Sequence, residues 1–349
     1  DAGTYQPDTG QTSCDDADAG HYVSSTGQEV QIACLAGTYN PNTGSSSSSA
    51  CGDADAGYYV LSTGQSTQTA CSAGTYQSLT AQSSCDDADA GSYVPTTGQT
   101  NQTDCGIGTY QNATGQDSCD DADAGSFVPI TGQTNQTDCA IGTYQASTGQ
   151  SSCVDADAGN YVDQTGQSSQ SACVAGTYQP DTGQDGCDDA DVGSYVPVTG
   201  QTSQTDCATG TYQASTGQTS CDDADAGHYV DQTGQSTQTA CLTGTYQSAT
   251  GQASCYDADA GHYVDQTGQS SQSACLEGTY QEDTGQDGCD DAESGHYVAQ
   301  TGQTDQTRCE VGTYQASTAQ SSCDDADAGY YVDRTGQTDQ LECDYGMYQ

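Results

Sequence analysis

Apolar and polar positions alternate only over very short segments along this chain. Typical segments are "TYQ" (4–6) and "QTS" (11–13), three to four residues of β-prone sequence. Such short alternation predicts β-strands, and the T-G-Q that recurs between the segments predicts turns. No stretch keeps a 3.6-residue apolar period over a useful length, so we expect almost no helix.

These segments belong to an internal repeat. The phrases "GTYQPDTGQ" (3–11) and "GHYVSSTGQ" (20–28) return throughout residues 1–349. They define about twenty half-modules of about 17 residues, paired into about ten 34-residue repeats, and therefore one continuous array. One copy carries three extra residues in "TGSSSSSAC" (43–51), near 45–50, where a surface turn can absorb them.

Comparing the copies shows which positions matter. The aromatic residue of G-x-Y is Tyr except at Phe127, so the ring packs and the hydroxyl is dispensable. Ala81 and Ala319 replace the glycine of T-G-Q, which predicts that a left-handed backbone is not required there. The four histidines occupy the variable position of G-x-Y, where we expect exposed side chains: His21, His228, His262 and His296.

Amino-acid composition limits the partners and the membrane association that can be expected of this chain. The 349 residues carry 49 Asp plus Glu, 2 Lys plus Arg and a formal charge of −47, which excludes a basic footprint for nucleic acid or an anionic membrane. No apolar run approaches the roughly 20 residues of a membrane span, so we expect no membrane insertion. No signal peptide is present and Asp1 begins in mid-repeat, so we expect a processed chain or a segment of a longer array.

The 20 cysteines recur at gaps that alternate between 20 and 14 residues, with one gap of 17, and without C-x-x-C or a cysteine–histidine cluster they predict disulfides rather than a zinc site. An oxidising, extracellular setting follows. Hairpins this small do not fold alone, so each rests on a neighbour or on a disulfide. We therefore expect an all-β, small disulfide-rich fold, an extended tandem-repeat rod of short hairpin modules.

The phrase C-x-x-G-T-Y, a turn with glycine, then Cys, resembles the ephrin-receptor-like cysteine-rich repeat, which is similar to tumour-necrosis-factor-receptor modules. The resemblance covers the whole chain. Family members usually carry C-x-x-C at each junction, and here one cysteine of each junction is missing. In "CDDADAG" (14–20) Ala17 stands at the second position, and in "QIACLAG" (31–37) Gln31 stands at the first.

The resemblance implies that the cysteine opening a module pairs with the one closing the same hairpin. The implied pairs are Cys34–Cys51, Cys71–Cys85, Cys105–Cys119, Cys139–Cys153, Cys173–Cys187, Cys207–Cys221, Cys241–Cys255, Cys275–Cys289 and Cys309–Cys323. The intervening hairpins have then lost a whole bridge, Ala17 together with Gln31. A rival pairing closes the longer loops, Cys14–Cys34 through Cys323–Cys343, and uses all twenty cysteines.

The family pairing leaves Cys14 and Cys343 over. "CDYGMYQ" (343–349) is the opening half of a module, and residues 1–14 lack only the cysteine before Asp1. The two ends are expected to complete one another between chains, by an interchain Cys14–Cys343 bridge in a head-to-tail filament. The alternative is a segment cut from a longer array.

The acidic motif after every second cysteine is the candidate metal site. D-x-D-x-G in a turn offers hard oxygens, as Ca²⁺ prefers. The candidate ligands are Asp16, Asp18, Asp53, Asp55, Asp87, Asp89, Asp121, Asp123, Asp155, Asp157, Asp189, Asp191, Asp223, Asp225, Asp257, Asp259, Asp325 and Asp327. The alternative is a solvated acidic turn, as expected of a marine or saline protein. No other cofactor is expected.

Asn101, Asn112 and Asn135 lie in N-x-T sequons and are candidate glycosylation sites, beside turns rich in Ser and Thr. No arrangement typical of catalysis is present, so we expect no enzyme. The pattern favours an extracellular structural protein that forms or decorates a surface filament, stalk or sheath, with itself as partner through head-to-tail or lateral assembly. The alternative is an adhesin or receptor-like ectodomain that binds a glycan or protein.

Overall fold

Short strands dominate the computed structural model, which describes residues 1–344 and 346. The first half of the chain holds β1 (Thr4–Tyr5), β2 (Asp15–Asp16), β3 (His21–Tyr22), β4 (Ile32–Ala33), β5 (Thr38–Tyr39), the 3-10 helix η1 (Ser48–Ala50), β6 (Gly52–Asp53), β7 (Tyr58–Tyr59), β8 (Thr69–Ala70), β9 (Thr75–Tyr76), β10 (Asp86–Asp87), β11 (Ser92–Tyr93), β12 (Thr103–Asp104), β13 (Thr109–Tyr110), β14 (Asp120–Asp121), β15 (Ser126–Phe127), β16 (Thr137–Asp138), β17 (Thr143–Tyr144), β18 (Val154–Asp155), β19 (Asn160–Tyr161) and β20 (Ser171–Ala172).

The second half continues with the same two-residue strands. They are β21 (Thr177–Tyr178), β22 (Asp188–Asp189), β23 (Ser194–Tyr195), β24 (Thr205–Asp206), β25 (Thr211–Tyr212), β26 (Asp222–Asp223), β27 (His228–Tyr229), β28 (Thr239–Ala240), β29 (Thr245–Tyr246), β30 (Tyr256–Asp257), β31 (His262–Tyr263), β32 (Ser273–Ala274), β33 (Thr279–Tyr280), β34 (Asp290–Asp291), β35 (His296–Tyr297), β36 (Thr307–Arg308), β37 (Thr313–Tyr314), β38 (Asp324–Asp325), β39 (Tyr330–Tyr331) and β40 (Leu341–Glu342).

The fold is built of antiparallel hairpins that repeat about every 17 residues, as the sequence predicts. In the hairpin of β9 and β10, Thr75 lies opposite Asp87 and Tyr76 opposite Asp86. Within the described residues no α-helix forms, and no helix could cross a membrane. The insertion near 45–50 contains η1, where the N–H of Ser49 donates to the hydroxyl of the N-cap residue Ser47 at 3.2 Å.

The second strand of each hairpin was predicted at the wrong place. "QTS" (11–13) lies in a bend, and the strand follows the cysteine instead, as in β2. The physical reason is that the wide loop gives its backbone hydrogen bonds to the next hairpin. Thus the N–H of Gln77 donates to the carbonyl of Gln99 at 3.1 Å.

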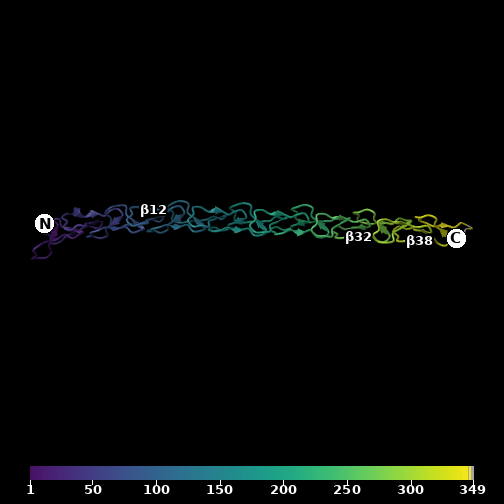
Figure 1. The fold of residues 1–349 in the computed structure, drawn as a ribbon, viewed down its shortest axis with the longest axis horizontal. Coiled ribbons are helices and arrows are strands. Elements are labelled where there is room, and N and C mark those ends of the chain that lie inside the picture. Colours follow the sequence, from purple (N-terminus) through teal and green to yellow (C-terminus); the bar gives the residue numbers. More distant parts are fainter. Residues whose placement is uncertain (345, 347–349) are drawn as a thin grey trace. The chain divides into compact units, whose positions relative to one another are not determined.

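The chain divides into two units, Asp1–Ser171 with Thr182–Gly186, and Ala172–Asp181 with Cys187–Gln349. Within each unit the hairpins follow one another in chain order (Figure 1). The N–H of Gly74 donates to the carbonyl of Val94 in the next hairpin at 2.8 Å. Backbone bonds of this kind link each hairpin to its successor.

Each hairpin also touches the one after next. A Cβ placed on Gly108 would lie within 3.0 Å of the carbonyl oxygen of Gly149, two hairpins later. Only glycine allows this approach, which recurs at the G-x-Y glycines of the interior hairpins. Hairpins of one kind therefore stack on one another, and two successive hairpins make one turn of 34 residues.

The T-G-Q turn requires a left-handed residue, contrary to the inference from the two alanine copies. Ala81 has φ 61° and Ala319 has φ 60°, matching the glycines elsewhere, such as Gly115 at 71°. A Cβ at an equivalent glycine, Gly115, would meet the Asp87 side chain at 3.4 Å, an ordinary contact distance, rather than a backbone carbonyl. The cost of the left-handed backbone, about 1 kcal/mol, is nevertheless present in these two copies.

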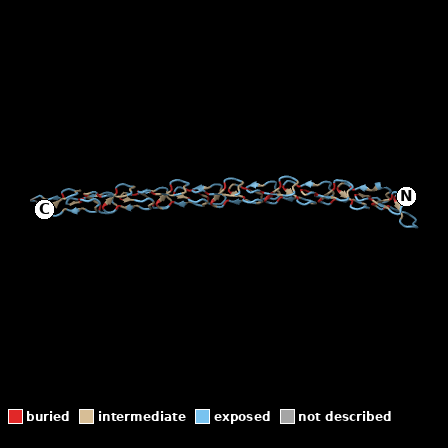
Figure 2. Cartoon of the chain, turned by 180° about the vertical axis from the view of Figure 1, so that it is seen from behind, coloured by how far each residue is buried: buried red, intermediate tan, exposed pale blue. Residues whose placement is uncertain are grey.

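The core is a thin line of small residues. Alanine, valine and cysteine are buried in each turn, for example Ala88, Val94 and Cys105 at 0% exposure. Figure 2 shows these buried residues as short stretches between exposed loops. The described G-x-Y tyrosines are half-buried, and the one ring–ring contact in the described part of the chain joins Tyr246 to the exposed Tyr256 within a single hairpin. Ring packing between modules is therefore a minor part of the core.

Candidate functional site

Two kinds of side-chain closure alternate along the chain, and the first is a cystine. The bonded pairs are Cys34–Cys51, Cys71–Cys85, Cys105–Cys119, Cys139–Cys153, Cys173–Cys187, Cys207–Cys221, Cys241–Cys255, Cys275–Cys289 and Cys309–Cys323. These are the pairs that the family resemblance implies, and the longer loops of the rival pairing are not closed. In each pair the opening cysteine is buried and the closing one is half-buried. We call these modules cystine hairpins.

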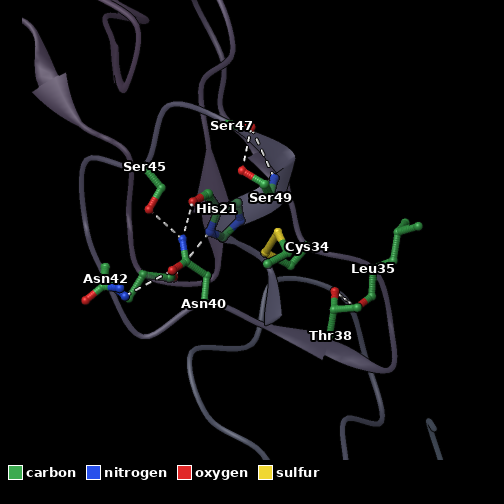
Figure 3. Close-up of a disulfide and its surroundings, with 11 residues drawn as sticks. His21, Cys34, Leu35, Thr38, Asn40, Asn42, Ser45, Ser47 and Ser49 are labelled. Atoms are coloured by element: carbon green, nitrogen blue, oxygen red, sulfur yellow. Dashed lines mark hydrogen bonds between the residues drawn. A yellow bond between two sulfur atoms is a disulfide. The ribbon is translucent and has the colours of Figure 1, made fainter. Parts of the chain in front are cut away.

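The surroundings of Cys34 show how a cystine hairpin meets the hairpin before it (Figure 3). The side-chain amide of Asn40 donates to the carbonyl of His21 at 3.0 Å and to the hydroxyl of Ser45 at 2.8 Å. Thr38 donates its hydroxyl to the carbonyl of Leu35 at 2.9 Å, and the Leu35 side chain points away from the chain. A polar brace therefore fixes the buried side of the closure, and an aliphatic side chain faces solvent beside it.

The second closure is a glutamine–aspartate clamp, in the hairpins that lack both cysteines. The N–H of Asp89 donates to Oε1 of Gln102 at 2.7 Å, and Nε2 of Gln102 donates to Oδ2 of Asp89 at 2.7 Å. This clamp joins residues 13 apart, where the cystine joins residues 14 apart. We call these modules clamp hairpins.

The clamp recurs along the whole chain with both bonds at 2.6–2.7 Å. The partners are Asp18–Gln31, Asp55–Gln68, Asp89–Gln102, Asp123–Gln136, Asp157–Gln170, Asp191–Gln204, Asp225–Gln238, Asp259–Gln272 and Asp327–Gln340.

One copy differs and shows what the clamp requires. Where Glu293 replaces aspartate, only its N–H bond to Gln306 remains, at 2.7 Å. The amide of Gln306 instead donates to the hydroxyl of Tyr280 at 3.4 Å. The side chain of glutamate is one methylene longer, so the carboxylate no longer meets the amide that an aspartate would meet.

Sequence reasoning missed the clamp because it treated Gln31 as the trace of a lost cysteine. The signal was available in the sequence. Glutamine occupies this position in all ten copies, whereas the preceding position varies among Val, Thr, Asn, Ser and Asp and the following one among Ile, Thr, Ser and Leu. A polar residue held constant across copies of an otherwise variable loop indicates a specific hydrogen bond.

Buried glutamines brace the cystine hairpins and were also missed. Gln247 is 1% exposed, donates from Nε2 to the carbonyl of Ser254 at 2.7 Å and accepts at Oε1 from the N–H of Ala249 at 3.1 Å. Clamp hairpins carry a buried valine at the equivalent position, such as Val230. Each hairpin type therefore combines one apolar and one polar element. A cystine hairpin has a cystine closure and a buried glutamine, and a clamp hairpin has a polar closure and a buried valine.

The predicted calcium ligands are separated by the structure into two roles. The second-position aspartates lie in strands rather than in a turn, as Asp87 does in β10, beneath the turn glycine of the hairpin two later. The fourth-position aspartates, such as Asp89, are engaged by clamp glutamines. Within residues 1–344 and 346 no group of three or more His, Cys, Asp or Glu side chains is placed to hold a metal ion. Calcium binding stays a prediction.

The histidines are half-buried rather than exposed. His21 lies opposite Ala33, and the Cε1 of its ring comes within 3.2 Å of where a Cβ on Gly64 would lie. In the part of the chain that the structure describes, Nδ1 of His228 is the one buried side-chain nitrogen or oxygen without a hydrogen-bond partner. A cross-strand alanine leaves room for the rings of His21, His228 and His262, whereas His296 lies opposite Arg308.

Where the variable residue is serine, the cross-strand residue is aspartate, and the two are bonded. Ser126 donates to Oδ1 of Asp138 at 2.9 Å, and Ser194 donates to Asp206 at 2.9 Å.

The predicted glycosylation sites are accessible, since Asn101, Asn112 and Asn135 are all exposed. Their glycosylation stays a prediction.

Three tyrosines have a raised pKa, and nearby carboxylates contribute to the shift in each. Burial raises the pKa of Tyr280, and the negative charges of Asp290 and Glu293 raise it further. Burial and then Asp191 and Asp188 raise the pKa of Tyr178. The pKa of Tyr330 is raised first by its hydrogen bond to Glu342, at 3.2 Å.

Cys14 and Cys343 carry free thiols, exposed and half-buried respectively. The rest of the predicted half-module at 343–349 lies largely outside the described residues, which omit 345 and 347–349. The proposed bridge between chains stays a prediction.

No protein-family model matches this chain, and no curated protein matches it in sequence. The likeness to ephrin-receptor-like repeats rests on the motifs quoted above. What the nine cystines establish is coarser: this is a disulfide-rich tandem-repeat protein of a secreted or extracellular kind.

Proposed function

We propose that the protein is a structural element of an extracellular surface, in a filament, stalk or sheath. The observation that carries this proposal is the regular alternation of cystine and clamp hairpins, in which, within each unit, an interior hairpin is hydrogen-bonded to the next and lies in close contact with the one after it. A ligand-binding ectodomain would need one or two hairpins with a distinct surface. Here the same closures recur at both ends and in the middle.

The proposed mechanism is mechanical and colloidal. A cystine that closes a loop of about 15 residues stabilises it by about 3 kcal/mol, which matters where the core is one alanine or valine thick. The formal charge of −47 keeps such chains hydrated and apart from other anionic surfaces. Calcium at the acidic strands and glycans on the exposed sequons would be additions to this frame, and absence of enzymatic activity is part of the proposal.

The test combines location with resistance. Antibodies against the protein should label intact, unpermeabilised cells or the material that they shed, and the purified protein should resist a broad-specificity protease until its disulfides are reduced. Labelling that requires permeabilisation would overturn the proposal. Digestion at equal rates with and without reductant would also overturn it, because the cystines would then contribute nothing to durability.

A further inference from the structure

The two crossings that link successive hairpins differ sharply in charge. The crossing from a cystine hairpin to a clamp hairpin, as in "CDDADAG" (14–20), carries 27 of the 49 carboxylates over its ten copies. The crossing from a clamp hairpin to a cystine hairpin, as in "QIACLAG" (31–37), carries 7. Because two hairpins make one turn, these crossings lie about half a turn apart within each unit, and one side is much less acidic.

An open groove lies on this less acidic side. It has a volume of about 270 Å³ where Tyr22, Ile32 and Leu35 line it together with the Cys34–Cys51 bridge. The corresponding groove one repeat later has about 420 Å³, between Tyr59, Leu61 and Cys85. The same structural position therefore produces the groove again after one turn.

An exposed aliphatic side chain stands beside the buried cysteine at most of these crossings. Leu35 is 72% exposed, and Leu242 and Leu276 are 69% and 67% exposed. The residue directly follows the cysteine at Leu35, Val174, Leu242 and Leu276, and it stands one residue later at Ile107, Ile141 and Val311. In the clamp hairpins the position equivalent to Leu35 holds the clamp aspartate, or Glu293 in one copy, and the position equivalent to Ile107 holds alanine except at Val192 and Ser294.

We propose that this less acidic, aliphatic side is the surface on which two copies of the chain pair laterally. The inference rests on the proposed structural role and names the contact that such a role would use. Aliphatic side chains of one copy would enter the tyrosine- and cystine-lined grooves of the other.

Charge and period favour a second copy as the occupant. A partner with the same charge of −47 can approach closely only where carboxylates are few, and that condition holds on this side. A second copy also has the same 34-residue period, so one fitted contact brings its neighbours in the same unit into register. Several weak contacts then act together, as linked binding sites do.

The affinity of this pairing should depend on salt concentration in the opposite sense to an association driven by electrostatic attraction. Between about 0.01 M and about 1 M salt the Debye length falls from roughly 30 Å to roughly 3 Å, so repulsion between two acidic chains is screened. Burial of aliphatic side chains is not weakened by this screening. Association is therefore expected to strengthen as sodium chloride is raised.

The experiment is sedimentation equilibrium of the oxidised protein after its two free thiols, at Cys14 and Cys343, have been alkylated, which removes covalent end-linking. The test variant is L35D/L242D/L276D. The matched control is L79D/I130D/V198D, which adds the same three charges at exposed aliphatic residues of the hairpin loops, outside the crossings described above.

We expect the unsubstituted protein and the control to dimerise with a dissociation constant that falls with salt, and the test variant to dimerise at least tenfold more weakly. Monomers at every salt concentration would overturn lateral pairing, and so would equal weakening in both variants. Protease resistance measured on the same samples keeps the two proposals apart, because a resistant monomer contradicts the pairing surface and leaves the structural role intact.

Discussion

If the clamp replaces a cystine at an equivalent place, a clamp hairpin should accept a cystine. Ala88 and Gln102 occupy the positions that Cys71 and Cys85 hold in the preceding hairpin, and Ala88 is fully buried. We predict that A88C/Q102C forms a tenth bridge under the conditions that form the other nine. Its Cα separation should match the 5.8 Å of Cys71–Cys85.

The expected change in stability is the contribution of the new bridge minus the contribution of the clamp hydrogen bonds that it replaces. A bridge around a loop of about 15 residues contributes about 3 kcal/mol in the loop-entropy model. The two clamp bonds to exposed Asp89 contribute about 0.5–1 kcal/mol each, the lower end of the usual range for hydrogen bonds. The net stabilisation is therefore about 1–2 kcal/mol, and amide exchange in hairpin 88–104 should slow by about 5- to 30-fold.

Hydrogen exchange read by mass spectrometry measures this hairpin against its neighbours in one sample. The control is Q102A, which removes the clamp without adding a bridge and should speed exchange in the same hairpin by about 5- to 30-fold. The reasoning is refuted if the thiols at 88 and 102 stay unlinked while Cys71 and Cys85 are bonded. It is also refuted if the bridged hairpin exchanges faster than the unsubstituted one.

Three further predictions concern backbone, clamp and pH. G108A should lower the free energy of unfolding by several kcal/mol, because the added Cβ would collide with a backbone carbonyl. G115A should lower it by about 1 kcal/mol, the cost of a left-handed alanine. Equal losses of stability in urea unfolding would contradict this prediction. E293D should restore the second bond to Gln306 and add about 1 kcal/mol, measured by hydrogen exchange, and unchanged exchange would contradict it. The pKa of Tyr280 is raised in the folded protein, so the unfolded chain loses this phenol proton first as pH rises. The contribution of Tyr280 to the free energy of unfolding is therefore complete below about pH 10 and is lost as pH rises through the folded pKa. Urea unfolding at about pH 9 and about pH 11 should show the loss, and Y280F should make the loss smaller.

The hairpin repeat could be predicted from sequence because its signals are local. Gly at the start of G-x-Y, the T-G-Q turn and the cysteine spacing each fix a few consecutive residues. The alternation of 14- and 20-residue cysteine gaps left two pairings open, and the resemblance to known repeats favoured the one that the structure contains.

What could not be predicted depends on contacts between hairpins. The strand after the cysteine was misplaced because the loop amides bond to the next hairpin, as Gln77 does to Gln99, and no residue of the loop reveals that partner. Ala81 misled because a left-handed alanine costs only about 1 kcal/mol, so the residue type does not reveal its backbone conformation, φ 61°. The clamp was overlooked because glutamine and aspartate are polar residues that usually face water.

The alternation of cystine and clamp hairpins is the central structural claim, and a cysteine map tests it directly. The protein is alkylated, digested without reduction, and its linked peptides are identified by mass spectrometry. We expect bridges only within hairpins, such as Cys71 with Cys85 and Cys309 with Cys323, and no bridge from Cys14 to Cys34. Peptides that link Cys14 to Cys34 and Cys51 to Cys71 would contradict the account, because the clamp hairpins would then be enclosed by the bridges rather than closed by their own side chains.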